Sequence, residues 1–304
     1  MRRIVIFAVL LALSGLALLW VSGGFDRIAV WAALEQRDFQ NRIARSLRDL
    51  RAGETGAFLF LVTACFAYGF VHAIGPGHGK VLIGGYGLGR RVPALRLAAI
   101  GLAASLGQAV TAVVLVYTGV LLLSLGREYM IGITEQVMAP ASYAAIALVG
   151  GWLTLRGLRK AMALNRESLT GHHHHDHHTH DADCGCGHRH GPTLEEISQA
   201  RSWKETLALI VSIAIRPCTG ALFVLLITWQ MGIGLVGIAG AVAMALGTAS
   251  VTIAIGIGAA GLRGGLVGSL TQSRFAARLL PAIEITAGLM IVLLSGGLLM
   301  RALA

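Results

Sequence analysis

The chain has 304 residues, of which 55% are hydrophobic and only 13% are charged, and its formal net charge is +10. Soluble domains carry charge on about a quarter of their residues, so this composition excludes one, and the apolar content also excludes disorder. The mean hydropathy of +0.71 and recurring apolar runs instead predict an all-α polytopic membrane protein.

Seven apolar segments are long enough to be membrane spans. They cover residues 4–22, 57–76, 97–125, 140–158, 206–230, 234–262 and 279–300. The first is longer than the apolar core of a usual signal peptide and no Ala-x-Ala site follows it, so we expect an uncleaved anchor, with a cleaved signal peptide as the alternative.

The basic residues lie in short stretches between the apolar runs, so we expect no nucleic-acid partner and interpret them by the positive-inside rule. This rule places the N-terminus in the cytoplasm of a multi-pass plasma (inner) membrane protein. Three further stretches fall on the same side: the loop that holds Lys80, Arg90, Arg91 and Arg96, the long loop from Arg156 to Lys204, and the loop with Arg263, Arg274 and Arg278.

Segment 25–56 is the exception, because it carries six arginines yet falls on the outer side. Its apolar residues recur at helical spacing among balancing acidic residues. This pattern predicts an amphipathic helix lying on the outer membrane face, and a solvated linker helix is the alternative.

An internal repeat follows the anchor. Pro76 matches Pro217, Gly107 matches Gly247 and Pro140 matches Pro281, at offsets of 141, 140 and 141 residues. Each copy holds three spans, and an odd number of spans inverts the second copy, so we expect six of the seven helices to form two inverted three-helix repeats.

The chain is thereby divided into four predicted parts. They are an anchor and external segment (1–56), the first repeat (57–158), a cytoplasmic His-rich loop (159–205) and the second repeat (206–304).

The predicted loop contains nine of the eleven histidines of the chain. Neutral imidazole binds Ni, Co, Zn and Cu, and thiolates add affinity for softer ions. The expected metal-capture residues are His172, His173, His174, His175, His177, His178, His180, Cys184, Cys186, His188 and His190. The internal position and the Cys-Gly-Cys sequence argue against an expression tag.

A second set of histidines closes the span 57–76 in the sequence His-Ala-Ile-Gly-Pro-Gly-His-Gly-Lys. Its glycine spacing and the valine after the lysine do not fit a phosphate-binding loop. Proline interrupts a helix, and irregular backbone at membrane depth must be buried in protein or line a wet cavity. We therefore expect His72 and His78 to converge on one ion; ordinary packing at a proline kink is the alternative. The residues expected to break or gate the helices are Gly75, Pro76, Gly77, Gly79, Lys80 and Pro217.

Two charged residues fall inside predicted spans. Arg216 precedes Pro217, and Glu284 lies near the start of the last span. An unpaired charge costs about 2.5–3.5 kcal/mol at membrane depth. Two interpretations stay open: a pair that joins the halves, or proton exchange by Glu284 in coupling.

The His-x-x-Gly-Pro-Gly-His-Gly-Lys segment, the Arg-Pro-Cys-Thr-Gly segment and the His-rich loop resemble the NicO-type nickel/cobalt efflux family from about Ala57 onward. The resemblance implies a plasma-membrane exporter of Ni2+ or Co2+, driven by an ion gradient, which gives metal resistance. It also implies that His72, His78 and Cys218, with the neighbouring Thr219, handle the ion. Five residues separate the two histidines and Gly77 replaces an acidic residue, so the His-x4-Asp-His motif of uptake permeases is not matched.

No nucleotide motif or nucleophile set is present, so we expect neither enzyme activity nor a cofactor. The expected partners are divalent metal ions and the lipid bilayer, and a homo-oligomer stays open. Three alternatives also stay open: transport of zinc, iron or manganese, metal uptake, and a membrane-bound metallochaperone or metal enzyme.

Overall fold

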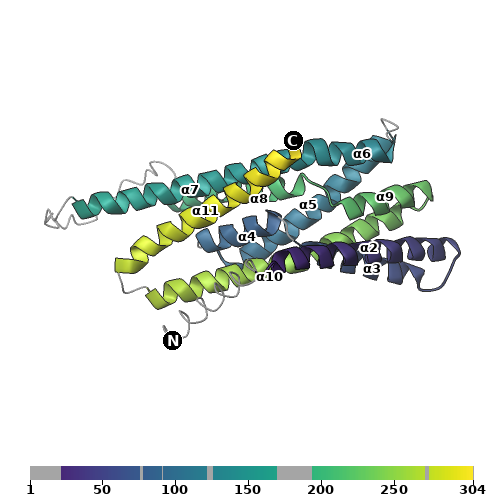
Figure 1. The fold of residues 1–304 in the computed structure, drawn as a ribbon, viewed down its shortest axis with the longest axis horizontal. Helices are drawn as coiled ribbons and strands as arrows, with labels where there is room; N and C mark the ends of the chain where they lie inside the picture. The colour runs from purple at the N-terminus through teal and green to yellow at the C-terminus, as the bar shows by residue number, and fades with distance from the viewer. Residues whose placement is uncertain are drawn as a thin grey trace, which may run out of the picture.

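The computed structural model describes residues 22–75, 78–90, 92–121, 126–169, 194–270 and 274–303. These residues are mostly helical (Figure 1). The helices are α2 (Gly24–Arg51), α3 (Ala57–Ile74), α4 (His78–Gly89), α5 (Ala94–Leu121), α6 (Arg127–Ile133), the π-helix η1 (Thr134–Met138), α7 (Ala139–Leu169), α8 (Leu194–Ala214), α9 (Thr219–Gln230), α10 (Gly234–Leu270) and α11 (Arg274–Leu303). The predicted anchor at 4–22 lies outside the described residues except for Ser22.

Five of the described helices are long and apolar enough to cross a membrane. They are Ala57–Ile74, Ala94–Leu121, Glu128–Ala163, Gly234–Gly265 and Pro281–Leu303. A sixth candidate is the pair Trp203–Ala214 and Thr219–Gln230, which is bent by 60°. The predicted span at 206–230 is therefore broken within the described helices, and α7 and α8 extend well into the segment 159–205 that was predicted to be a loop.

The expectation that Lys80 lies in a loop is wrong, because residues 78–89 form α4; its side of the membrane stays a prediction. A Cβ on Gly69 would touch Met244 of α10, one on Gly84 would touch Ile255, and one on Gly87 would touch Ala259. The contacts thus advance along α3, α4 and α10 in the same direction, and α4 continues the course of α3. Five of its twelve residues are glycines, a composition that favours a loop in a sequence-based prediction. In this structure the glycines instead allow α4 to pack closely against other helices.

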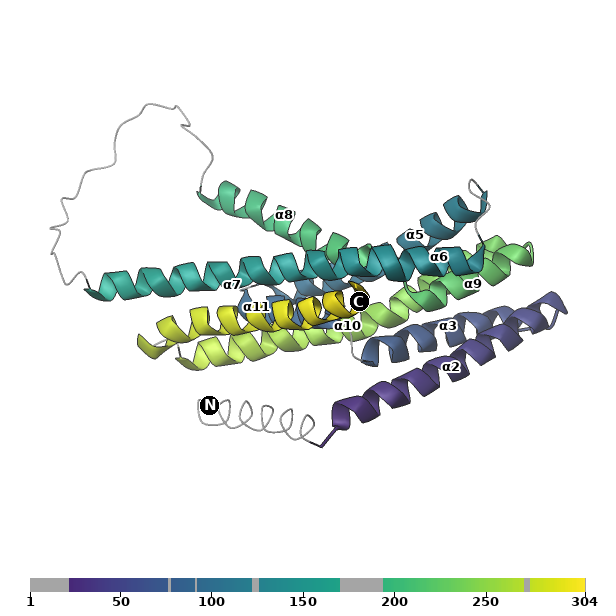
Figure 2. The same ribbon diagram turned by 45° about the horizontal axis from the view of Figure 1, so that its top comes forward.

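The predicted amphipathic helix over 25–56 is confirmed as a helix, α2, which runs beside α3 (Figure 2). The expectation that its apolar stripe rests on the membrane face is wrong for its C-terminal half, where Ile43 and Leu47 are fully buried in protein. Periodicity identified the stripe but could not identify the surface it covers. Near the other end, Trp31 and Leu34 remain exposed.

The core consists of two clusters that divide the bundle along its length. One cluster contains side chains of α2, α3, α9, the second half of α5 and the first part of α10. The other contains side chains of α4, α7, α8, α11 and the first half of α5. The chain passes from one cluster to the other at the break between α3 and α4, and again at the break between α8 and α9. Both breaks therefore lie near the middle of the bundle.

Candidate metal pathway

The first break leaves backbone carbonyls at the end of α3 without helical partners. The ammonium group of Lys80, on the first turn of α4, donates hydrogen bonds to the carbonyl oxygens of Ala73 and Gly75. A lysine reaching back across the break thus satisfies the carbonyls that the interrupted helix exposes.

His72 lies in the last turn of α3, immediately before this break. Its Nδ1 is 3.0 Å from Oε1 of Gln36 on α2. The imidazole stacks on the ring of Tyr68, one turn earlier, with centroids 6.0 Å apart and an interplanar angle of 7°. The ring is therefore held from two sides by side chains of α2 and α3.

Tyr68 connects His72 to the second break. A Cβ on Gly220 would lie 2.3 Å from Cε1 of Tyr68, so the ring packs directly on the first turn of α9. The tyrosine also lies close to Cys218 and Thr219. The structure thus brings His72 into the same neighbourhood as these two predicted pathway residues.

The two breaks also meet through α4 and α8. Gly79, at the start of α4, contacts Ile213 near the end of α8, where an added Cβ would be 3.4 Å from Cγ2. Nε2 of Gln108 on α5 donates hydrogen bonds to the carbonyl oxygens of Ile213, at 3.3 Å, and Arg216, at 3.2 Å. Carbonyl groups of the irregular backbone before the buried Pro217 are therefore hydrogen-bonded by a polar side chain from the other half of the chain.

Positive charge surrounds His72. Lys80 and Arg216 are both near enough to act electrostatically on the imidazole. The guanidinium of Arg216 lies over the ring of Tyr143, 5.2 Å from its centroid, and donates a hydrogen bond to its hydroxyl. Among the described residues, no group of three His, Cys, Asp or Glu side chains could hold a metal ion.

The predicted pair between Arg216 and Glu284 is wrong, because each residue has another partner. The carboxylate of Glu284 is 1% exposed and lies between α7 and α11. Its oxygens are 2.5 Å from Nζ of Lys160 and 3.3 Å from Nε of Arg156. The sequence indicates that a buried carboxylate needs a cationic partner. It does not indicate which cation is the partner, because α7 also carries cations at comparable depth.

Other predicted residues cannot be placed. Pro76, Gly77 and the tract 172–190 lie outside the described residues, and so does the side chain of His78. The convergence of His72 and His78 on one ion therefore stays a prediction, as does metal capture by the tract.

Sequence reasoning missed Gln36, Tyr68 and Tyr143. A signal for the first was present, because Gln36 and Gln40 interrupt the apolar stripe of α2 between Ala32 and Ile43 at helical spacing. A polar side chain on an otherwise buried helix face requires a hydrogen-bond partner in the protein.

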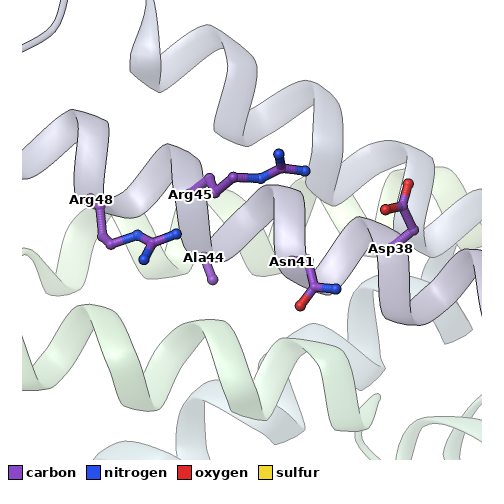
Figure 3. Close-up of a pocket in the computed structure, with 5 residues that line it drawn as sticks. All are labelled: Asp38, Asn41, Ala44, Arg45 and Arg48. Carbon is purple, nitrogen blue, oxygen red and sulfur yellow. The ribbon is translucent and has the colours of Figure 1, made fainter.

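A separate hollow lies along α2 and is lined by Asp38, Asn41, Ala44, Arg45 and Arg48 (Figure 3). Its single carboxylate is already paired with Arg42 at 2.8 Å. Two arginines and no histidine or cysteine make this hollow unsuitable for a divalent cation.

Comparison with known proteins agrees with the chemistry at the helix breaks. The NicO family, described as high-affinity nickel-transport protein, matches residues 58–199 and 168–304. The chain belongs to the NicO family. It is therefore a multi-pass membrane protein that transports nickel, and the predicted resemblance is confirmed.

A relative from Haemophilus influenzae, named "Putative nickel/cobalt efflux system", is 29% identical over 234 residues, which cover 74% of this chain and 71% of the relative. No solved structure matches the chain. The family match begins after α2, so Gln36 lies outside the residues shared with the family.

Proposed function

We propose that this NicO protein exports Ni2+ and Co2+ from the cytoplasm across the plasma membrane, through a polar pathway at the two helix breaks. The observation that carries this proposal is the placement of His72 at the end of α3, joined through Tyr68 to the first turn of α9. The name of the Haemophilus influenzae relative supports cobalt as a second cargo and efflux as the direction.

Two inverted repeats are the proposed architecture of the pathway. Gly247 and Gly107, which are 140 residues apart, both pack closely on a helix of the other half: Gly247 of α10 on the backbone of Phe66 in α3, and Gly107 of α5 on Ala214 in α8. The adjacent residues continue the pattern, because Thr248 donates to a carbonyl of α3 and Gln108 to carbonyls at the end of α8. A pseudo-two-fold axis between the breaks explains both pairs, and transporter sites lie near such axes.

The ligand chemistry suits the proposed cargo. Imidazole nitrogen from His72 and sulfur from Cys218 favour borderline metals such as Ni2+ and Co2+ over hard cations. In this proposal the Lys80 ammonium holds the carbonyls of the broken helix while no metal is present. An ion that uses these carbonyls must displace the ammonium group, which keeps the empty pathway closed to other cations.

The His-rich tract 172–190 is proposed to lie in the cytoplasm and to collect metal for the pathway. Its glycine-containing sequence favours many weak, exchanging arrangements over one rigid site. Glu284 is proposed to be a structural charge, because Lys160 and Arg156 lie 2.5 Å and 3.3 Å from its carboxylate oxygens.

The test is radiolabelled nickel flux in membrane vesicles of known sidedness, with and without a proton gradient. We expect the double variant His72→Ala, His78→Ala to abolish flux while insertion into the membrane is unchanged. Thr63→Ala is the matched control on α3, since this exposed hydroxyl bonds to the carbonyl of Leu59 in its own helix. Flux retained by the double variant would show that neither histidine belongs to the pathway. Protection of cells against zinc alone would overturn the proposal that nickel and cobalt are the cargo.

A further inference from the structure

The contact between Gln36 and His72 joins a helix outside the family match to the candidate pathway. Nε2 of Gln36 donates a hydrogen bond to the carbonyl oxygen of Ala32, one turn earlier, at 2.9 Å. This bond identifies which end of the amide carries nitrogen, so the atom facing His72 is the carbonyl oxygen. The amide is thereby held in one orientation by its own helix.

The orientation of the amide determines the tautomer of His72. An amide oxygen can only accept, so Nδ1 of His72 must carry the hydrogen in the 3.0 Å contact. In the neutral ring the lone pair then lies on Nε2, which is the atom left to bind a metal. A hydrogen bond to the other ring nitrogen also increases the basicity of a ligating imidazole and fixes its direction.

Further contacts keep this arrangement in place. Tyr68 stacks against the face of the imidazole, as described above, and limits rotation of the ring. Ala32 of α2 contacts Gly75, where an added Cβ would lie 3.4 Å from the alanine methyl group. Successive turns of α2 thus rest against the helix break and against His72.

We infer that Gln36 is a positioning residue for nickel transfer: it fixes His72 in the tautomer that presents Nε2 to the metal. The inference rests on the proposed role of His72 in the pathway. It also assigns a function to α2, which supplies part of the nickel site from a segment that the family match does not include.

The experiment measures the initial rate of radiolabelled nickel transport by the full-length protein in proteoliposomes, over a range of nickel concentrations. Gln36→Leu removes the acceptor at nearly constant volume, and Gln36→Asn keeps an amide that is too short to reach the ring. Loss of such a partner typically weakens metal binding by about 10–100-fold. We expect KM to rise by at least about tenfold in both variants, with the maximal rate changed much less.

Two controls separate positioning from packing. Gln36→Glu retains an oxygen acceptor and should keep KM close to that of the unmodified protein. Leu47→Ala loosens the buried face of α2 without touching the acceptor, so it should lower protein yield or stability and leave KM unchanged. An equal rise in KM for Leu47→Ala, or no rescue by glutamate, would overturn the inference in favour of a structural role.

His72→Ala distinguishes failure of the proposed pathway from failure of the positioning role of Gln36. If this variant transports nickel normally, the proposed pathway fails and the role of Gln36 fails with it. If His72→Ala abolishes transport but Gln36→Leu and Gln36→Asn both retain the normal KM, only the positioning role is refuted.

Discussion

The close packing of α3 on α10 gives the sharpest prediction about the integrity of the pathway. A methyl group on Gly247 would lie 2.1 Å from the carbonyl oxygen of Phe66 and 2.8 Å from the nitrogen of Phe70. Ordinary contact begins at 3.4 Å, so Gly247→Ala requires the two helices to separate by about 1.3 Å. Both opposing atoms are backbone, and no change of rotamer can relieve the clash.

The cost can be estimated from three contributions. Overpacking of this kind costs about 1–3 kcal/mol. Separation of the helices also weakens the hydrogen bond from Thr248 to the carbonyl of Gly69, which is 3.2 Å long and is worth about 0.6 kcal/mol in a membrane. Alanine offsets about 0.5–1 kcal/mol through its better helix propensity. We therefore expect Gly247→Ala to lower the free energy of unfolding by about 1–3 kcal/mol.

The assay compares Gly247→Ala with Gly258→Ala on the same helix, where an added Cβ meets nothing within 4 Å. Unfolding of the purified proteins in detergent should show a loss for the first variant and a small gain for the second. Because His72 lies one turn beyond Gly69 on the displaced helix, nickel flux should also fall only in Gly247→Ala. Equal stability and equal flux in the two variants would refute the close approach of α3 and α10.

Three further predictions concern the charges and the tract. Glu284→Gln should destabilise the protein by about 1–3 kcal/mol, less than for a fully buried pair because Lys160 and Arg156 are partly exposed; adding Lys160→Gln should recover part of the loss in thermal unfolding. Lys80→Met leaves two carbonyls at the end of α3 without a donor and should cost about 1–3 kcal/mol, with Lys80→Arg closer to the unmodified protein in the same assay. Deletion of 172–190 should weaken efflux more at low than at high metal concentration, whereas equal loss at all concentrations would place the tract in the permeation path.

The long spans could be predicted from the sequence because an apolar run of 18 or more residues indicates a membrane helix directly. α5, α10 and α11 agree with predicted segments in this way. The breaks were also indicated, by Pro76 and Pro217, but α4 was not. Its helical state depends on burial of Leu82 and Ile83 against other helices, and a local sequence does not contain that information.

The candidate site was predictable only in part, for a related reason. The helix-break motif indicated His72, whose imidazole is a metal ligand, and the family resemblance indicated Cys218. Gln36 contacts His72 because of how α2 and α3 are aligned along each other. The periodicity of each helix alone does not specify this alignment. The polar interruptions in the stripe of α2 show that such a contact must exist, but the residue at the other end is fixed only by the fold.

The charges around His72 lead to a last prediction, on selectivity. Lys80 and Arg216 act on this histidine, and within the described part of the chain no Asp or Glu does. Mg2+ and Ca2+ are hard cations that need oxygen ligands, above all carboxylates, whereas Ni2+ and Co2+ also bind imidazole and thiolate. The two positive charges repel every divalent cation alike, so selectivity rests on the nitrogen and sulfur ligands, which hold nickel in preference to the hard cations.

Large excesses of Mg2+ should accordingly leave nickel flux unchanged. Thr219→Asp places a carboxylate at the start of α9, close to Tyr68, and should make flux sensitive to Mg2+; Thr219→Asn is the matched neutral control. Inhibition of the unmodified protein by Mg2+ at concentrations comparable to nickel would contradict this prediction, because it would show that imidazole and sulfur ligands do not set the selectivity.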